Sequence, residues 1–347
     1  MKVMITGHKG YIGTVLVPMV LAEGHEVVGY DSDLYERCTF GDGIVDVPEI
    51  RKDIRDAELS DLEGVDAVLH LAGLSNDPLG DLNPELTYEI NHQASVRLAK
   101  LSKQAGVRRF IFSSSCSNYG AAGDNLIDEN GAFNPVTPYG ESKVNVELSV
   151  APLADETFSP TFMRASTAYG MSPRIRFDLV LNNLVAWAYT TGEVYLKSDG
   201  SPWRPIVHVE DISAAYIAAL EAPRETVHRA AFNVGSTTEN YQIRDIAEMV
   251  RQVVPGSKVA FATDAAPDKR CYRVDCGLIA RTLHGFKPQW TARRGIEQLY
   301  EAFQRVGLKL EDFEGERFKR IAHIKKLVGN GEIGTDLRRR SKLSNVG

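Results

Sequence analysis

The feature that most constrains the fold is a glycine-rich turn at residues 7–13, between an apolar run at 3–6 and an apolar stretch that ends at residue 23. The three glycines follow the spacing G-x-x-G-x-x-G, and the flanking runs have the lengths of a buried strand and a helix. Glycine has no Cβ, so the chain can turn sharply and a phosphate can approach the N–H groups at the helix N-terminus. The turn therefore predicts a binding site for the pyrophosphate of a dinucleotide. The expected contacts come from Gly7, Gly10, Tyr11, Ile12 and Gly13.

An acidic residue stands where a dinucleotide motif needs one. A second strand is expected at 26–30, and Asp31 follows it, 18 residues after Gly13 (31 − 13 = 18). An acid at this offset, about 20 residues past the last glycine, accepts hydrogen bonds from ribose hydroxyls. Its charge would repel a 2′-phosphate, so the sequence favours NAD over NADP as the cofactor.

Strand and helix patterns continue to alternate through the first half of the chain. Apolar strands are expected at 65–71, 109–112 and 158–164, with a long helix at 84–104 and another that begins near Pro138. This order predicts an α/β fold with a doubly wound, parallel sheet of the Rossmann type. In such a sheet the ligands bind beyond the carboxyl ends of the strands.

The second half is less regular and predicts a smaller C-terminal lobe. Helices are expected at 177–189, 243–254 and 294–304. Two segments are expected to return to the main sheet, 205–209 with a helix after it and 231–234.

These patterns predict three parts. Residues 1–170 would form the NAD-binding domain, joined by 205–235, and residues 171–204 with 236–310 would form the second lobe. Residues 311–347 would be a helical, basic extension. Its positive charges are interpreted as the solvated face of a helix and a frayed tail, with an acidic partner as the weaker alternative.

Composition excludes several classes of function. The chain has 347 residues, 43% of them apolar, and a net charge of −6, which argues against nucleic acid as the main partner. No apolar run approaches the roughly 18 residues of a membrane span, and the N-terminus reads as strand and turn instead of a signal peptide, so we expect a cytoplasmic protein. The cysteines lack metal-ligand spacing, which predicts reduced, packed thiols and no metal site. They are Cys38, Cys116, Cys271 and Cys276.

A tyrosine and a lysine on one helix face form the candidate catalytic pair. Tyr139 and Lys143 are four residues apart, which places them on the same side of the helix expected there. Removing a hydride from a sugar carbon requires a base for the hydroxyl proton. Tyrosine has an ordinary pKa of about 10 and is a weak base, but a nearby ammonium favours the phenolate. Ser115, at the end of an expected strand, would hold the substrate oxygen from the other side.

The motif set resembles the extended short-chain dehydrogenase/reductase family, in its nucleotide-sugar epimerase/dehydratase branch, over about residues 1 to 306. The resemblance implies a catalytic triad of Ser115, Tyr139 and Lys143. It also implies NAD contacts from residues beyond the glycine turn, namely Asp31, Asp53, Ile54, Leu71, Ala72, Gly73, Asn91, Tyr139 and Lys143. A homodimer through the two long helices after the fourth and fifth strands is a further implication.

The same resemblance implies that the second lobe, 171–204 with 236–310, is a smaller C-terminal substrate-binding lobe for a nucleotide sugar. Two separated arginines suit a diphosphate, because a guanidinium binds phosphate oxygens in pairs. The expected substrate contacts are Ser75, Ser117, Asn118, Asn183, Arg204 and Arg270.

Departures from the family pattern narrow the reaction. The related 4,6-dehydratases carry Asp-Glu after the catalytic hydroxyl, whereas Cys116 and Ser117 stand here, so dehydration lacks its acid and base. Thr167 and Pro205 stand where family members often have Asn and Asp, so the sequence does not identify the sugar of the substrate.

Three functions fit the sequence. The leading one is an NAD-dependent epimerase that oxidises a nucleotide sugar, at C4, to a transient ketone and returns the hydride to the other face. The alternative is an NAD(P)H-dependent 4-ketoreductase of a deoxy- or branched nucleotide sugar. The third is a non-catalytic dinucleotide sensor, which is disfavoured because both Tyr139 and Lys143 are present.

Overall fold

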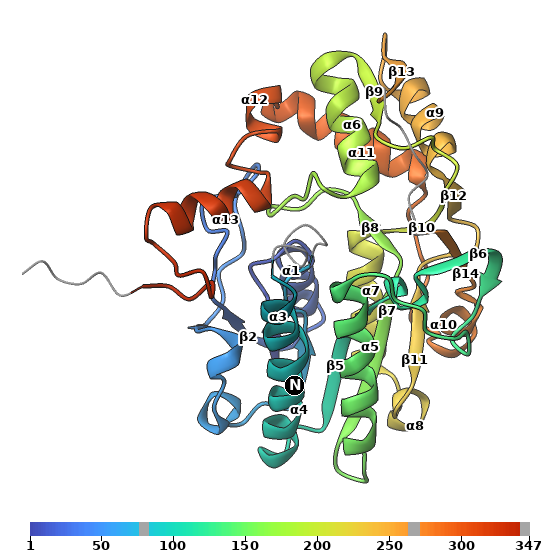
Figure 1. The fold of residues 1–347 in the computed structure, drawn as a ribbon. Coiled ribbons are helices and arrows are strands. Elements are labelled where there is room, and N and C mark those ends of the chain that lie inside the picture. The colour runs from blue at the N-terminus through green and yellow to red at the C-terminus, as the bar shows by residue number, and fades with distance from the viewer. Residues whose placement is uncertain (76–82, 263–270, 341–347) are drawn as a thin grey trace, which may run out of the picture.

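A parallel sheet of seven strands forms the centre of the protein in a computed structural model that describes residues 1–75, 83–262 and 271–340 (Figure 1). The strand order is β11-β7-β5-β4-β1-β2-β3, which reverses direction at β1 and β4 as a doubly wound sheet does. The predicted fold class is therefore confirmed. The strands are β1 (Lys2–Thr6), β2 (Glu26–Asp31), β3 (Glu49–Arg51), β4 (Ala67–His70), β5 (Arg109–Ser115), β7 (Ser159–Ala165) and β11 (Ala231–Val234).

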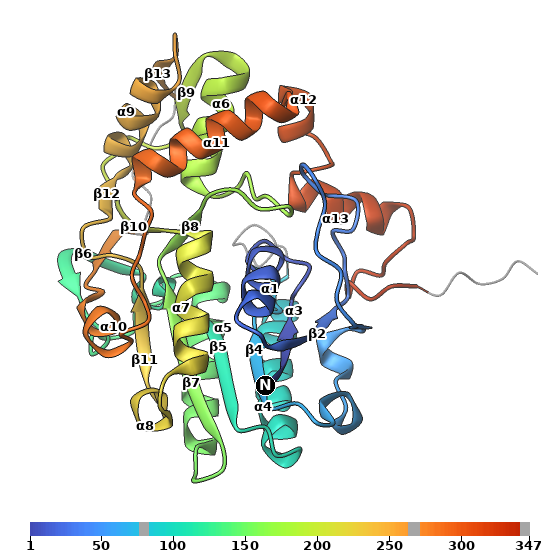
Figure 2. The same cartoon turned by 180° about the vertical axis from the view of Figure 1, so that it is seen from behind.

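Helices cover both faces of this sheet. Helices α3 (Pro84–Thr87), α4 (Ala94–Gln104) and α5 (Pro138–Val150) lie on the face toward the viewer in Figure 1. Helices α1 (Gly13–Ala22) and α7 (Val209–Glu221) lie on the opposite face, which Figure 2 turns forward. Because helices cover both faces, the side chains on both faces of a central strand must be mostly apolar. Strand β4 is accordingly buried along its whole length.

The long helix expected at 84–104 contains a π-helical turn, η3 (Tyr88–Gln93), between α3 and α4. Such turns frequently occur at functional sites. This one contains the buried side chain of Asn91.

One predicted strand pairs elsewhere than expected. Residues 231–234 do join the main sheet as β11, but 205–209 lie largely in β10 (Trp203–His208), which belongs to a separate three-stranded sheet. There β10 is parallel to β8 (Thr167–Tyr169) and antiparallel to β12 (Asn240–Gln242). The prediction for 205–209 was wrong because β11 and β5 already occupy the two edges of β7. The division of the chain into domains at the stated boundaries stays a prediction.

A second lobe stands beyond the carboxyl ends of the main strands. Its helices are α6 (Val180–Thr191), α9 (Ile243–Val253) and α11 (Ala292–Val306), beside the strand pair β9 (Glu193–Leu196) and β13 (Lys258–Phe261) (Figures 1 and 2). Its apolar core includes Phe177, Leu181, Ile246, Ile296 and Phe303. The remaining elements are β6 (Ala121–Ile127), paired with β14 (Cys271–Val274), the helices α8 (Arg224–Val227) and α10 (Gly277–Thr282), and the short 3-10 turns η1 (Ile54–Asp56), η2 (Leu59–Leu62), η4 (Cys116–Tyr119) and η5 (Ala151–Leu153).

The C-terminal extension is packed through residue 340, in contrast to the frayed tail that its charge suggested. It contains α12 (Leu310–Phe313) and α13 (Arg320–Gly329). Four apolar side chains of α13 and of the segment after it are buried in a core of the main sheet, namely Ile324, Leu327, Ile333 and Leu337. Their burial explains why this part of the extension is packed instead of frayed. Residues 341–347 lie outside the described part.

Within residues 1–75, 83–262 and 271–340, no helix has the length and apolar character needed to cross a bilayer. All four cysteines are free thiols, and three of them are buried, as the sequence predicted.

Candidate active site

The glycine turn, β2 and the loop after β4 line one cavity of about 160 Å³. The structure brings together here nearly all the residues expected to bind a cofactor. They are Gly7, Gly10, Tyr11, Ile12, Gly13, Asp31, Asp53, Ile54, Leu71, Ala72 and Gly73, with Ser75 from the expected substrate set.

Glycine is sterically required at two positions of the turn. Gly7 has a φ of +71°, and a Cβ on it would lie 2.8 Å from the backbone nitrogen of Ala72. A Cβ on Gly13 would lie 2.3 Å from the carbonyl oxygen of Gly7. The strand ends and the helix start can therefore approach closely only without side chains, which leaves the cradle open for a ligand.

Asp31 lies at the end of β2 with its carboxylate held by backbone groups. Its oxygens accept hydrogen bonds from the N–H of Lys9, at 3.0 Å, and of Asp33, at 2.8 Å. Burial raises the pKa of Asp31, and the backbone N–H groups partly offset that effect. The carboxylate is thus fixed at the pocket wall, where ribose hydroxyls would reach it.

Asp53 is fixed by Arg55 on the far side of the same cavity. The Arg55 guanidinium donates to both carboxylate oxygens, at 2.9 and 2.7 Å. Burial alone would raise the pKa of Asp53, but the hydrogen bonds from Arg55 hold it below its usual range.

Asn91 lies behind the cofactor cavity and does not line it. Its side-chain oxygen accepts from the N–H of Leu74, at 2.7 Å, and its amide donates to the Leu74 carbonyl, at 3.0 Å. The same amide donates to Ser142 of α5. Asn91 therefore holds the loop after β4 in place by mimicking a neighbouring strand.

The candidate catalytic residues share a second, larger cavity of about 620 Å³. Ser115 lies at the end of β5, and Tyr139 and Lys143 lie one turn apart on α5. The two cavities adjoin, because Ile12, Leu71, Gly73, Leu74 and Ser75 line both. Thr137 caps α5 by accepting from the N–H of Gly140, which fixes where the helix begins.

Lys143 is held rigidly beneath Tyr139. Its ammonium donates to the carbonyl oxygen of Ser113 at 2.6 Å and lies 5.5 Å from the centre of the Tyr139 ring. Burial lowers the pKa of Lys143 to about 7. A positive charge in this position favours the phenolate of Tyr139.

Ser115 is oriented by its neighbour. The Ser117 hydroxyl donates to the Ser115 oxygen at 2.9 Å, and the Ser117 N–H donates to it at 3.1 Å. Ser117 also lines the catalytic cavity. The Ser115 hydroxyl can thus keep its own hydrogen for a substrate oxygen.

Asn118 is not in the cleft, contrary to the expected substrate role. It is fully buried, and its amide donates to the Ser114 hydroxyl and to Glu147 of α5. Glu147 in turn forms a buried ion pair with Arg164 of β7, at 2.7 Å. Asn118 points inward because this network requires a donor behind the serine run.

A third cavity, of about 520 Å³, contains the other expected substrate residues. Asn183 of α6 and Arg204 of β10 line it, and Arg204 also lines the catalytic cavity. The Arg204 guanidinium lies 5.8 Å from the centre of the Tyr272 ring. Arg270 lies outside the described residues.

Sequence reasoning missed several cavity residues. Arg176 and Asp178 precede α6, form an ion pair at 2.6 Å and border the cavities. Their charge was the only signal in the sequence that could have pointed to them. Arg320 and Leu337 of the extension line the cofactor cavity, and no local pattern predicted this because the contact spans the length of the chain. Across the described residues, no group of three potential ligands could hold a metal ion.

Comparison with curated proteins and solved structures gives consistent matches. UDP-glucose 4-epimerase of Bacillus subtilis is 26% identical over 86% of this chain and 94% of that protein. The enzyme of the same name from Lactobacillus helveticus is 29% identical over 83% and 92%. The structure of MoeE5 in complex with UDP-glucuronic acid and NAD is 26% identical, with a TM-score of 0.77 over 88% of this chain and 99% of that one.

A further structural neighbour is TunA, described as an NAD dependent NDP-hexosamine 5,6-dehydratase, at 25% identity and a TM-score of 0.77 over 88% of this chain and 98% of TunA. The model of the NAD dependent epimerase/dehydratase family matches residues 3–235. With this match over more than half of its length, the chain belongs to the NAD dependent epimerase/dehydratase family of enzymes.

Proposed function

We propose that the protein is a nucleotide-sugar epimerase with NAD as its resident cofactor, acting at C4 of the sugar. The observation that carries the proposal is the common cavity of Ser115, Tyr139 and Lys143, which opens into the dinucleotide cradle. The relatives named above, two UDP-glucose 4-epimerases, support the reaction class.

The glycine turn at residues 7–13 fits a dinucleotide because it leaves space for the phosphates and presents backbone N–H groups to them. A Cβ on Gly7 or Gly13 would collide with backbone atoms, and the N-terminal end of α1 faces the cavity. Asp31 would accept the adenosine ribose hydroxyls and disfavours a 2′-phosphate. Bound there, NAD would supply the acceptor and donor of a hydride.

Tyr139 acts as the base and then as the acid. Its phenolate accepts the proton of the sugar hydroxyl as the ketone forms and returns that proton to the oxygen when the hydride comes back. Lys143 stabilises the phenolate by its charge, and the backbone carbonyl of Ser113 fixes the position of that charge. Ser115 donates a hydrogen bond to the reacting oxygen.

The nucleotide end of the substrate would occupy the cavity of Asn183 and Arg204. Arg204 reaches both this cavity and the catalytic one, which suits a group that binds the diphosphate between nucleoside and sugar. Arg270 stays in the proposal from the sequence alone.

The test begins with the cofactor. Denaturing the purified protein and identifying the released nucleotide should give NAD. The protein is then offered UDP-, GDP-, CDP- and dTDP-sugars with and without added NAD(P)H. Formation of an isomer without any added cofactor supports the epimerase, whereas a strict requirement for NADPH contradicts it and indicates the ketoreductase.

A further inference from the structure

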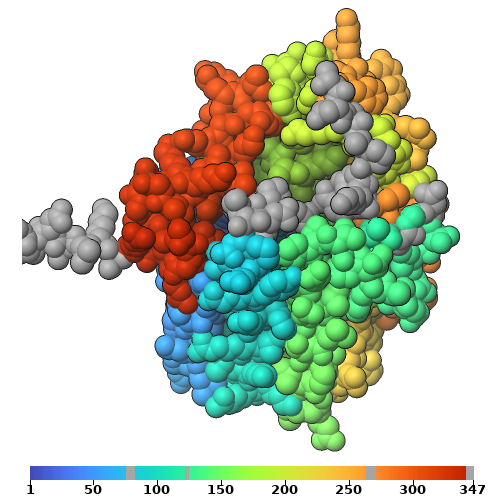
Figure 3. All heavy atoms as spheres, viewed as in Figure 1, coloured from blue at the N-terminus to red at the C-terminus, as the bar shows by residue number. Residues whose placement is uncertain are grey.

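The C-terminal extension connects the two lobes beside the cofactor cavity, which its Arg320 and Leu337 line. Phe313 and Phe318 are buried in the core of the second lobe, whereas Leu327 and Leu337 are buried in the core of the main sheet. Figure 3 shows this segment, in red, lying between the blue N-terminal region and the yellow-green lobe. The match to MoeE5 covers 99% of that chain but 88% of this one, so this chain has additional length.

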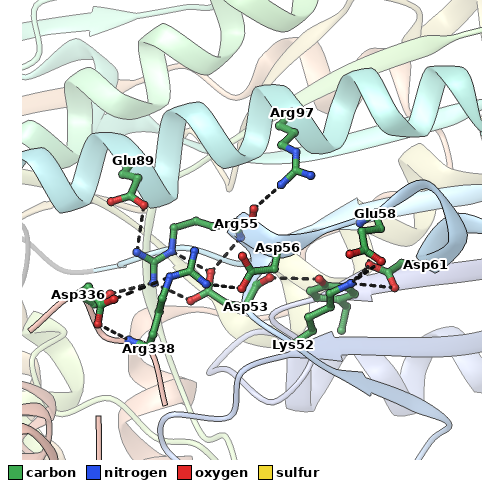
Figure 4. Close-up of polar contacts among 11 residues, drawn as sticks. Lys52, Asp53, Arg55, Asp56, Glu58, Asp61, Glu89, Arg97, Asp336 and Arg338 are labelled. Carbon is green, nitrogen blue, oxygen red and sulfur yellow. Dashed lines mark hydrogen bonds and ion pairs between the residues drawn. The ribbon is translucent and has the colours of Figure 1, made fainter. Parts of the chain in front are cut away.

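Polar contacts fasten the extension to the loops that border the cavity (Figure 4). Arg55, which holds Asp53, also donates to the backbone carbonyl of Asp336 at 2.8 Å. Arg338 forms an ion pair with Asp56. Arg339 donates to the carbonyl oxygen of Asp33 at 2.7 Å. Arg338 and Arg339 of the extension are thus bound to loops of the same chain that border the cofactor cavity.

Arg320, the first residue of α13, carries an uncompensated charge at this place. It is only 9% exposed, lines both the cofactor cavity and the cavity of Arg204, and stacks its guanidinium 4.3 Å from the centre of the Tyr35 ring. Within the described part of the chain, its guanidinium donates one hydrogen bond, of 3.5 Å, to the Ser75 hydroxyl, and no carboxylate lies at ion-pair distance from it.

The surroundings of Arg320 leave an excess of positive charge. Of the arginines and carboxylates around Arg320, Arg176 and Asp178 act on it most strongly, and Asp178 is already bonded to Arg176 at 2.6 Å. Burial, and after it the charge of Arg176, lower the pKa of Arg320. A buried guanidinium in this state is costly unless an anion binds it. The N-terminal end of α13, whose first residues line the cavity, adds to the positive potential.

We propose that the extension is a fixed clasp beside the bound nucleotide, and that Arg320 binds a diphosphate through its guanidinium. The ligand is either the pyrophosphate of the dinucleotide or the diphosphate of the nucleotide sugar, because Arg320 reaches both cavities. The inference rests on the proposed function for the nature of these ligands. It assigns the binding residue to a segment beyond the family match at 3–235.

The experiment measures ligand binding to full-length variants in place of activity. Arg320→Gln removes the charge, Arg320→Lys keeps it without the paired donors, and Arg317→Gln is the matched control. Arg317 is exposed, belongs to the same segment and lines none of the three cavities. Protein stripped of cofactor is titrated with NAD and, separately, cofactor-loaded protein with UDP, by calorimetry. Circular dichroism verifies that each variant is folded.

We expect Arg320→Gln to lower the affinity for one of the two ligands by about 10- to 100-fold. This loss corresponds to one pair of charge-assisted hydrogen bonds. Arg320→Lys should fall between, and Arg317→Gln should stay within about twofold of the parent. Weaker NAD binding identifies the cofactor as the ligand, and weaker UDP binding identifies the substrate.

Unchanged affinity of Arg320→Gln for both ligands would overturn the clasp while leaving the proposed function intact. If Arg320→Gln does not fold, Arg320→Lys provides the test. An Arg320→Lys variant that binds NAD and UDP as tightly as the parent protein does would again contradict the inference. If the unaltered protein binds neither NAD nor UDP, the proposed function fails and the clasp fails with it.

Discussion

At the scale of single residues, the proposed role of Tyr139 as a base depends on the position of Lys143. Lys143 is buried beside the Tyr139 ring and cannot rotate away, because its ammonium is bonded to the Ser113 carbonyl at 2.6 Å. The group whose charge favours the phenolate is thus positioned before any substrate binds, which limits the reorganisation needed during the reaction. The spacing of Tyr139 and Lys143 was visible in the sequence, whereas the Ser113 carbonyl was not, because a backbone atom leaves no mark on residue identity.

Replacing Tyr139 with Phe should lower turnover by about 100- to 10,000-fold, the usual contribution of a positioned acid–base group. Bound NAD should remain, because the cradle residues are unchanged. Initial rates and the ratio of cofactor to protein measure the two effects. Tyr300→Phe, which removes the same hydroxyl from the surface of α11, is the control and should keep full activity. Retained turnover in Tyr139→Phe would remove Tyr139 from the mechanism.

Replacing Lys143 with Met should stabilise the cofactor-free protein in a pH-dependent way. The folded-state pKa of Lys143 is about 7, below its unfolded value of 10.5, so the unfolded chain binds more protons between these limits. The free energy of unfolding of the parent protein therefore gains a contribution that rises with pH from 7 to 10.5, at about 1.4 kcal/mol per pH unit. The Met variant lacks this contribution.

The advantage of Lys143→Met should consequently be largest at and below pH 7 and shrink toward pH 10. Urea denaturation at several pH values measures the difference in the free energy of unfolding. A difference that does not change with pH would show that the ammonium is not buried at a cost.

At the scale of elements, the sequence predicted the strands and helices that carry the cofactor and catalytic residues, because glycine spacing and apolar runs are local signals. It did not predict the partner of β10 or the packing of α13, which depend on contacts between residues distant in the chain. The π-helical turn at Asn91 escaped for another reason. One extra residue in a helical turn converts that turn to a π-helix but hardly alters the spacing of apolar residues, so the sequence pattern does not reveal it.

The buried pair of Glu147 and Arg164 joins α5 to β7 behind the serine run. Glu147→Leu should cost about 3–5 kcal/mol of stability, because Arg164 would remain buried without its partner. It should also loosen Ser114 and Asn118, which bond to Glu147. Glu301→Leu, an exposed substitution on α11, is the control and should change the free energy of unfolding by at most about 0.5 kcal/mol. Equal losses in the two variants, measured by urea denaturation, would contradict a structural role for the pair.

At the scale of the whole molecule, the two lobes face each other across adjoining cavities that Leu74, Ser75 and Arg176 help to join. A homodimer through the helical stretch 84–104 and α5 remains a prediction. Leu148 of α5 is 62% exposed, and we expect it to lie in that interface. Leu148→Asp should therefore weaken association at least tenfold in sedimentation equilibrium, while Leu310→Asp, at an exposed position on α12, should not. A monomeric parent protein would refute the dimer.

The central claim is that the hydride leaves the sugar and returns to it within one active site. The most direct measurement follows deuterium placed at C4 of the accepted nucleotide sugar, with no reductant added, by NMR and mass spectrometry of the product. The account predicts an epimer that keeps the deuterium at the same carbon through many turnovers. Loss of the label to water, or product only in proportion to added NAD(P)H, would contradict it.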